Sequence, residues 1–314
     1  MPKLKLGTKS VLMMSIILIA SFVALGAYFV HETTEVLLHN ANVSVTKQAS
    51  NKVDKITLDL NAVTQSLLNY TTYFSGHGFA FLKNAKEQSL QDNVKKLVLN
   101  KEFVREAWLV FLHEKQPYFS YEAFERPDGS VGLYSNTPII LQSPLLKKVI
   151  STGRPARRST GPTLLLNGKQ HFGYVMAMPI FDVHQELVAV AGVFVSIEMV
   201  QDRYFPTTGI ENGFFMGGGN RLFAINRDHS LQGRDFRDVM KGQEVQEIEE
   251  FRENAPPNSQ KLTNFYSEVL HSEAILALYT FRPLKAIPQD HNWMIGAVIS
   301  KKELYRMSRA CVLE

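Results

Sequence analysis

The sequence predicts an α+β protein in which an N-terminal membrane helix and a long stalk helix carry two antiparallel sheet subdomains in tandem. Three observations lead to this prediction. Residues 11–30 contain no charged residue, and residues 49–74 place apolar side chains at alternating spacings of four and three. The chain that follows contains two regions, residues 101–200 and 201–300, in which short extended patterns are bounded by turn residues. Helical patterns followed by strand patterns are typical of the α+β class.

Residues 11–30 are predicted to form a transmembrane helix, because about 20 helical residues span the ~30 Å hydrocarbon core of a bilayer. Three lysines precede this segment, Lys3, Lys5 and Lys9. Basic flanks favour the cytoplasm, so residues 1–10 are expected there and the bulk of the chain in the periplasm. The expected location is therefore a bacterial inner membrane, crossed once. The alternative is a cleaved signal peptide ending near Gly26, which also exports the rest of the chain.

Residues 31–100 are expected to form the stalk and packing helices. An apolar stripe with heptad spacing consists of Ala49, Val53, Ile56, Leu60, Val63, Leu67, Tyr70 and Phe74. This pattern indicates a seam between helices, and homodimer formation through the stalk helix is the first interpretation. Packing of the same stripe on its own domain is the alternative, and both can hold at different heights. Gly76 and Gly78 are expected to end this helix, and a second helix is predicted over 83–99.

Residues 101–200 are predicted to form a membrane-distal, PAS-like sheet subdomain. Strands are expected at 106–113, 117–124, 156–166, 171–181 and 187–198. Asn167-Gly168 is a strong hairpin signal between the third and fourth of them. A short helix is predicted over 143–150, with Ser143 as its N-cap and Gly153 as its stop.

Residues 201–300 repeat the pattern more weakly and are predicted to form a membrane-proximal, PAS-like subdomain. Its strands are expected at 214–216, 221–226, 260–267, 273–284 and 292–299, with a helical, acidic stretch at 235–252. Gly217 to Gly219 are interpreted as a turn, because the Gly-Lys-Ser/Thr ending of a phosphate loop is missing. Residues 301–314 are expected to form a helix that leads toward a second membrane span, which would lie in a longer receptor.

Composition and motifs argue against several functional classes. The net charge of +4 is too small to indicate nucleic-acid binding. The single cysteine, Cys311, cannot form an internal disulfide, and the histidines show no metal-binding spacing. No Gly-x-Ser-x-Gly nucleophile motif is present. We therefore expect no metal, no cofactor and no enzymatic activity.

Three segments carry a family resemblance: residues 167–181, residues 190–198 and residues 292–295. Their order and spacing resemble the double Cache (dCache) sensor region of bacterial methyl-accepting chemotaxis proteins, and look closest to the Tlp-type receptors of Helicobacter and Campylobacter relatives. The similarity covers essentially the whole chain, but no single motif is diagnostic. It implies a periplasmic chemoreceptor dimer that binds a small metabolite, usually in the membrane-distal sheet.

The resemblance also implies signalling to the cytoplasmic chemotaxis machinery through a C-terminal part beyond this chain. One alternative is the sensor region of a histidine kinase or cyclase, because the same module serves several outputs. Another is a membrane-tethered binding protein without signalling output.

The sequence departs from the amino-acid-binding members of this family. They carry Arg-x-Trp-Tyr at the start of the inserted helix, where this chain has Ser143 to Leu146. They also place an aspartate on the last distal strand, where this chain has no carboxylate before Glu198. An ammonium group would then be buried without a partner, which costs several kcal/mol. The sequence thus favours a small organic acid over an amino acid.

The candidate ligand-binding residues are aromatic or basic: Trp108, Tyr118, Tyr121, Tyr134, Arg157, Arg158, His171 and Tyr174. A guanidinium group matches the geometry of a carboxylate, and tyrosine hydroxyls can orient it. Neighbouring residues of a strand face opposite sides, so at most one of Arg157 and Arg158 is expected to reach the ligand. The alternative for Trp108 and most of the tyrosines is a place in the ordinary core.

Overall fold

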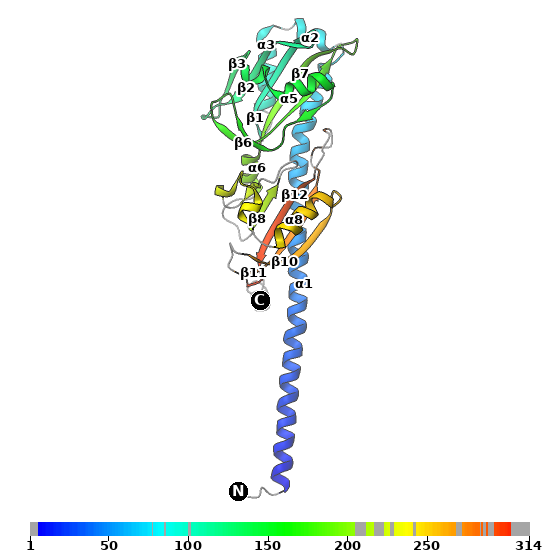
Figure 1. The fold of residues 1–314 in the computed structure, drawn as a ribbon, viewed down its shortest axis with the longest axis vertical. Helices are drawn as coiled ribbons and strands as arrows, with labels where there is room; N and C mark the ends of the chain where they lie inside the picture. The colour runs from blue at the N-terminus through cyan, green and yellow to red at the C-terminus, as the bar shows by residue number, and fades with distance from the viewer. Residues whose placement is uncertain are drawn as a thin grey trace.

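The computed structural model describes residues 6–76, 78–84, 86–99, 102–204, 212–216, 223–226, 229–240, 243–267, 272–282, 284, 287 and 292–302. Figure 1 shows helix α1 (Leu6–Tyr73) as a long rod, with two sheets lying against its C-terminal half. The first sheet lies at the end of the molecule away from the N-terminus, and the second lies between it and the bare part of α1 (Figure 1). The predicted α+β class, with two antiparallel sheets in tandem, is confirmed.

Helix α1 has 68 residues, which corresponds to a length of about 100 Å. Its segment Met13–Thr33 is long and apolar enough to cross a membrane, by length and composition. The large apolar side chains there are exposed, as a lipid-facing helix requires. The helix ends at Tyr73, and Gly76 adopts a φ of +61°, which a glycine tolerates without strain. The predicted helix end is therefore confirmed.

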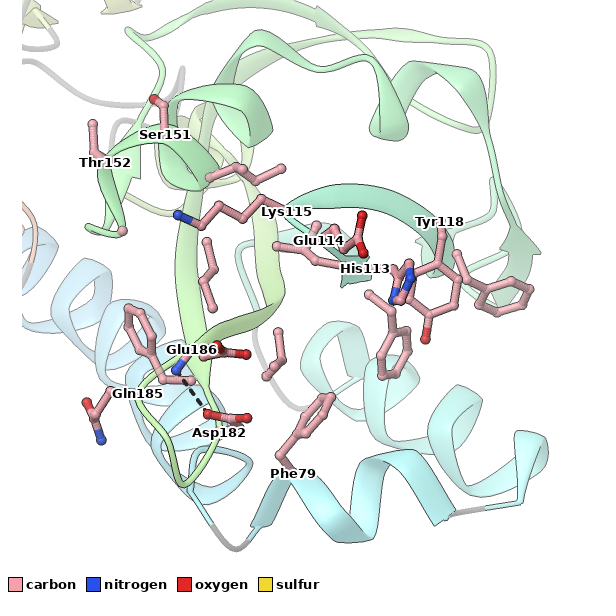
Figure 2. Close-up of a pocket in the computed structure, with 18 of the residues that line it drawn as sticks. Phe79, His113, Glu114, Lys115, Tyr118, Ser151, Thr152, Asp182, Gln185 and Glu186 are labelled. Atoms are coloured by element: carbon pink, nitrogen blue, oxygen red, sulfur yellow. Dashed lines mark hydrogen bonds between the residues drawn. The ribbon is translucent and has the colours of Figure 1, made fainter.

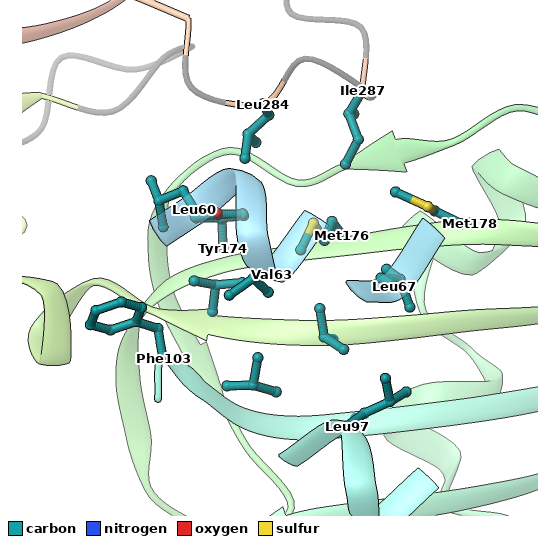
Figure 3. Close-up of a cluster of buried hydrophobic side chains, with 14 of the residues drawn as sticks. Leu60, Val63, Leu67, Leu97, Phe103, Tyr174, Met176, Met178, Leu284 and Ile287 are labelled. Atoms are coloured by element: carbon teal, nitrogen blue, oxygen red, sulfur yellow. The ribbon is translucent and has the colours of Figure 1, made fainter. Parts of the chain in front are cut away.

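The apolar stripe of α1 packs within the chain. Five of its residues are at most 3% exposed: Val53, Ile56, Leu60, Val63 and Leu67. They share one core cluster with Met176 and Met178 of the first sheet (Figure 3). Packing on its own domain is thus the interpretation that holds for this stretch. Contact between two copies of α1 at this height would have to use another face of the helix.

The first sheet has seven strands: β1 (Val104–His113), β2 (Gln116–Glu125), β3 (Val131–Ser135), β4 (Ala156–Arg157), β5 (Gly161–Leu164), β6 (Gln170–Phe181) and β7 (Leu187–Ser196). Their order is β3-β2-β1-β7-β6-β4, and β5 also pairs with β6. The helices around it are α2 (Gly78–Asn84), α3 (Glu87–Leu99), α4 (Pro138–Leu141), α5 (Pro144–Thr152) and α6 (Ile197–Tyr204).

Most elements of this part agree with the sequence predictions. The helix predicted over 143–150 is α5, with Ser143 at its N-cap position and Gly153 at its C-cap with φ +62°. The single strand predicted over 156–166 is wrong, because the chain forms two short strands, β4 and β5. The strand predicted to reach residue 198 ends at Ser196, where α6 begins. The short elements α2, β3 and α4 were not predicted, because a single turn or a five-residue strand carries little periodicity.

The two faces of the first sheet are covered differently. The inner face packs on α1 and α3, with Leu109, Tyr174 and Met176 among its buried residues. The outer face packs on α4 and α5, with Trp108 and Val190 among its buried residues. Alternation along each strand therefore decides which side chains meet α1 and which meet the outer cover.

The second sheet has five strands, β8 (Asn212–Met216), β9 (Phe223–Asn226), β10 (Gln260–Ser267), β11 (Ser272–Phe281) and β12 (Trp293–Ser300), in the order β10-β11-β12-β8-β9. The 3₁₀-helix η1 (His229–Leu231) and the helices α7 (Phe236–Val239) and α8 (Gln243–Asn254) accompany it. The acidic stretch predicted as one helix is thus two. The predicted turn at Gly217 to Gly219 and the C-terminal helix after residue 302 lie outside the described residues.

Helix α6 joins the two sheets and contacts α1. The Tyr204 hydroxyl donates a hydrogen bond to the Asp59 carboxylate of α1, and the Arg203 guanidinium lies 4.0 Å from the same carboxylate. Burial and the bond to Asp59 raise the pKa of Tyr204 to about 12, so its hydroxyl remains a donor at neutral pH. Strand β7 is therefore connected through α6 to a fixed point on α1.

Candidate ligand-binding site

Two carboxylates are buried on the outer face of the first sheet. Glu106 of β1 is 4% exposed and Glu122 of β2 is 0% exposed. Glu122 lies opposite Trp108 in the β1–β2 ladder, so Glu106, two residues before Trp108, is its diagonal neighbour on the same face. Carboxylates are seldom buried without a compensating partner. This pair therefore marks a candidate functional site.

The segments that lie over the outer face, α4, α5 and the β5–β6 turn, are called the cover below. Each carboxylate accepts a hydrogen bond from one part of this cover. Glu122 Oε1 accepts hydrogen bonds from the Ser120 hydroxyl and, at 3.2 Å, from the backbone N–H of Thr137 before α4. Glu106 Oε2 accepts a hydrogen bond of 2.8 Å from the backbone N–H of Leu166, in the turn between β5 and β6. Two hydrogen bonds, one to Glu122 and one to Glu106, thus connect the cover to the sheet.

The electrostatics of the pair favour a positive partner. Burial raises the pKa of Glu106 to about 7, the bond from Leu166 opposes this rise, and the charge of Glu122 adds to it. Glu122 Oε2 and Thr137 Oγ1 are buried and have no hydrogen-bond partner in the described part of the chain. An unpaired buried carboxylate oxygen is costly, and a cationic N–H donor would relieve that cost.

Aromatic side chains surround the acidic pair. Trp108 is 1% exposed and lies against Gly192 of β7, where any side chain would collide with the indole ring. Tyr134, which lies opposite Glu122 on β3, stacks on Phe124 with ring centroids 4.8 Å apart. Aromatic and apolar side chains beside a few polar groups are typical of small-molecule sites. Among the described residues, no group of three His, Cys, Asp or Glu side chains could hold a metal ion.

The structure places six of the eight predicted site residues in three separate places. Trp108 and Tyr134 lie on the outer face beside Glu122. Tyr118 and Tyr121 line a different hollow at one end of the sheet. Arg157 and Tyr174 contact Trp293 of the second sheet, and burial raises the pKa of the Tyr174 hydroxyl. A single site formed by all eight residues is therefore not observed.

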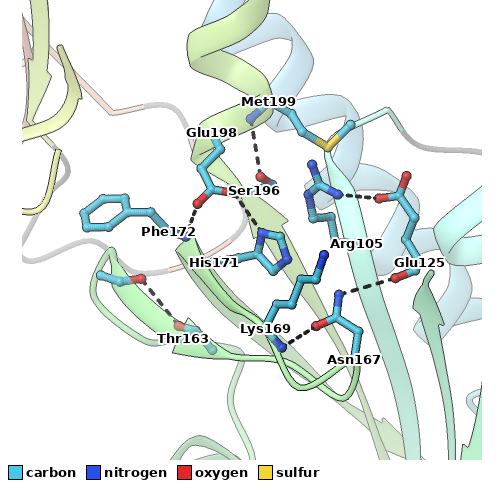
Figure 4. A network of polar contacts seen from close by, with 11 residues as sticks. Arg105, Glu125, Thr163, Asn167, Lys169, His171, Phe172, Ser196, Glu198 and Met199 are labelled. Carbon is cyan, nitrogen blue, oxygen red and sulfur yellow. Dashed lines mark hydrogen bonds and ion pairs between the residues drawn. The ribbon is translucent and has the colours of Figure 1, made fainter. Parts of the chain in front are cut away.

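The remaining two predicted residues lie away from the acidic pair. His171 Nδ1 lies 2.8 Å from Glu198 Oε2, and Glu198 also accepts a hydrogen bond from the backbone N–H of Phe172 (Figure 4). This contact ties β6 to the first turn of α6. Arg158 is exposed. Arg158 follows the last residue of β4, so the alternation within a regular strand does not decide its direction.

Sequence reasoning missed Glu106 and Glu122. The argument that an ammonium group would lack a buried partner considered only the last distal strand, β7, whereas Glu106 and Glu122 are buried on β1 and β2, one and two strands away from it. A partial signal was present, since Glu122 lies between Tyr121 and Ala123 and Glu106 directly precedes Ala107 and Trp108. Their proximity depends on the β1–β2 register, which the sequence alone did not reveal.

Comparison with solved structures places this fold among sensory domains. The chain is similar to the periplasmic sensory domain of the Campylobacter jejuni chemoreceptor Tlp1, with a TM-score of 0.62 and 13% identity over 86% of this chain and 98% of that one. It is also similar to the extracellular domain of the putative histidine kinase soHK1S-Z6, with a TM-score of 0.59 and 8% identity over 87% of this chain and 98% of that one.

A third similar structure contains a bound amino acid. It is the ligand-binding domain of the Pseudomonas fluorescens chemoreceptor CtaA in complex with L-isoleucine, with a TM-score of 0.54 and 11% identity over 87% of this chain and 98% of that one. No protein-family profile and no curated protein sequence matches the chain. The fold is thus that of dCache-type sensory domains, as the resemblance predicted, and these neighbours are sensors rather than enzymes.

Proposed function

We propose that this chain is the ligand-sensing region of a transmembrane chemoreceptor, and that it binds a small molecule carrying a primary ammonium group between Glu106, Glu122 and their cover. The observation that carries the ligand class is the unpaired, fully buried Oε2 atom of Glu122. A primary ammonium has three N–H donors, which is one for each carboxylate and one for the Thr137 hydroxyl. The apolar part of the ligand would lie against Trp108.

The domain arrangement in this proposal follows the sequence prediction. Residues 1–10 are cytoplasmic, 11–30 cross the inner membrane and 31–100 form the stalk and packing helices. Residues 101–200 and 201–300 are the membrane-distal and membrane-proximal subdomains in the periplasm. The span Met13–Thr33 on the same helix that carries both sheets supports this arrangement. A histidine kinase output is the second candidate, because extracellular domains of histidine kinases share the fold.

Signal transmission would begin at the two hydrogen bonds that connect the cover to Glu106 and Glu122. A ligand ammonium would bind the carboxylates that also accept hydrogen bonds from the backbone N–H groups of Leu166 and Thr137, and so would alter the position of both segments. The cover and strand β7 then change their relative position, and α6 carries that change to Asp59 of α1. A ligand that binds one of two such arrangements more tightly shifts the equilibrium between them.

The expected preference for an organic acid rested on the missing ammonium partner before Glu198 and on Arg157 or Arg158 as the partner of a carboxylate. Arg157 lies over the Trp293 ring on the opposite side of the sheet from Glu122, and Arg158 is exposed. The arrangement therefore favours a cation over an anion at this site. Binding of organic acids that depends on Arg158 would restore the earlier expectation.

The test is a thermal-shift screen of the full chain in a neutral detergent against primary amines, amino acids, organic acids and purines. Ligands that bind only the folded state raise the midpoint by mass action. We expect shifts with amines, lost in Glu122→Gln and retained in the control Arg158→Ala. Binding of a cation should also release a proton from Glu106 near pH 7, which calorimetry in two buffers detects. An amine shift that survives Glu122→Gln would contradict the proposed site.

A further inference from the structure

A separate hollow lies beside the C-terminal end of α1, where the β1–β2 turn, the β6–β7 turn, α2 and the end of α5 meet (Figure 2). Its volume is about 1200 Å³, and ligand sites usually measure about 300–1,000 Å³. Neither Glu106 nor Glu122 lines it. The Gly76 backbone N–H, just after α1, donates a 2.7 Å hydrogen bond to the Phe181 carbonyl at its edge.

The wall of this hollow is aromatic. Six rings line it, those of Phe79, Phe111, Tyr118, Phe119, Tyr121 and Phe181. Phe111 lies 6.4 Å from Tyr118 and 6.2 Å from Tyr121 between ring centroids, so these rings form one continuous surface. Tyr118 is 61% exposed and is therefore accessible from solvent. The faces of such rings attract cations.

The rim of the hollow is acidic. Glu114, Asp182 and Glu186 line it, together with the single lysine Lys115 and His113 (Figure 2). The C-terminal end of α5 also lines it, and the last turn of that helix contains no basic residue. A helix C-terminus carries partial negative charge, which favours a nearby cation. The local balance is thus negative, although the whole chain carries +4.

The backbone holds these polar side chains in an unusual conformation. Glu114, Lys115 and Gln185 have φ values of +49°, +61° and +63°, in the left-handed region that favours glycine and asparagine. The other non-glycine residues with positive φ in the described chain are asparagines. Glu114 and Lys115 are the two turn residues between β1 and β2, where a two-residue hairpin of type I′ requires positive φ at both positions. All three residues line the same hollow.

We propose that this hollow is a second ligand site, which takes an organic cation with an apolar body. The positive group would lie among Glu114, Asp182 and Glu186, and the apolar body would lie against the rings. A quaternary ammonium suits this site because it is held by charge and ring faces without donating hydrogen bonds. The same group has no N–H donor for Glu122 Oε2, so the two sites can be tested separately.

The experiment is isothermal titration of the full chain, in a neutral maltoside detergent, with benzyltrimethylammonium as the probe and benzoate as the control of opposite charge. We expect saturable binding of the cation alone, weakened by added salt. Tyr118→Ala and Glu186→Gln should each weaken binding by roughly 5- to 30-fold. The exposed control residues are Tyr266 and Glu250 of the second subdomain, and Tyr266→Ala and Glu250→Gln should leave the affinity unchanged.

Absence of saturable binding at millimolar probe, equal binding of benzoate, or affinity unaffected by Tyr118→Ala and Glu186→Gln would each overturn this proposal. Tyr118→Ala and Glu186→Gln change exposed side chains, so both variants should fold. Circular dichroism checks that their secondary structure is unchanged. Glu122→Gln separates the two proposals. It should abolish binding of primary amines at the outer face and leave binding of benzyltrimethylammonium intact.

Discussion

The guanidinium carbon of Arg157 lies 5.7 Å from the centre of the Trp293 ring. This contact joins β4, in the first sheet, to the first residue of β12 in the second sheet. Tyr174 of β6 meets the same indole edge-on, with ring centroids 5.5 Å apart. Trp293 is 0% exposed, so it is a buried aromatic centre between the two sheets. Arg157 and Tyr174, which the sequence suggested for ligand binding, thus pack against Trp293 at the junction between the two sheets.

Replacement of Trp293 by alanine should destabilise the protein by about 3–5 kcal/mol, because the substitution leaves a cavity between the sheets. Trp293→Phe should cost less, since a ring remains to meet Tyr174 and Arg157. Urea denaturation followed by circular dichroism measures both values. Equal stabilities of the alanine variant and the parent chain would contradict the role of Trp293 as the junction.

The stability of the protein should fall as the pH rises from about 4.5 to about 7. The pKa of Glu106 is raised to about 7 in the folded state, from an ordinary value of 4.5, so the folded protein holds this proton more tightly than the unfolded chain. The stabilisation is complete below pH 4.5 and is lost as the pH passes 7, up to roughly 3 kcal/mol. Unfolding midpoints between pH 4.5 and pH 8 measure it. Glu106→Gln should flatten the profile, and the exposed control Glu250→Gln should not.

Gly192→Ala should destabilise the outer face by about 1–3 kcal/mol, because the added methyl group overlaps the Trp108 ring. It should also weaken amine binding, since Trp108 lies beside Glu122. Gly161→Ala is the matched control, because an added Cβ at Gly161 meets no atom within 4 Å. Thermal unfolding and amine titration of both variants check this prediction. Similar losses in the two variants would show that the overlap with Trp108 is not the cause.

The homodimer that the sequence predicted through the stalk helix should use the face of α1 that carries Leu58. Leu58 is 71% exposed, whereas Leu60 is 0% exposed against the sheets. In a Cys311→Ser background, Leu58→Cys should form disulfide-linked dimers in membranes under mild oxidation, and Leu60→Cys should not. Cross-linking of neither variant would count against a dimer contact on this face.

The sequence predicted the long strands and α1 well, because their hydrophobic patterns extend over many residues. The heptad stripe on α1 was ambiguous, since the same spacing suits a partner helix or the chain's own sheets, and burial of Leu60 and Leu67 resolves it. The candidate site was predicted poorly. Glu106 and Glu122 meet only through the pairing of two strands, and Arg157 faces the junction because β4 is a two-residue strand whose position the sequence did not reveal.

In the proposed receptor, the unbroken length of α1 would convert a small rotation at the sheets into a larger displacement at the N-terminal end of the helix. In the receptor proposed above, the contact between Tyr204 and Asp59 would be the pivot of α1, and about 50 helical residues extend from it for roughly 80 Å toward Leu6. A tilt of about one degree at that pivot would displace the far end by roughly 1.4 Å, which is comparable to the helix shifts of known allosteric proteins. A slight rearrangement at the ligand would therefore be sufficient to move the N-terminal end of α1. A proline at an exposed position of α1 on the N-terminal side of the sheets should kink the helix and reduce the displacement at that end.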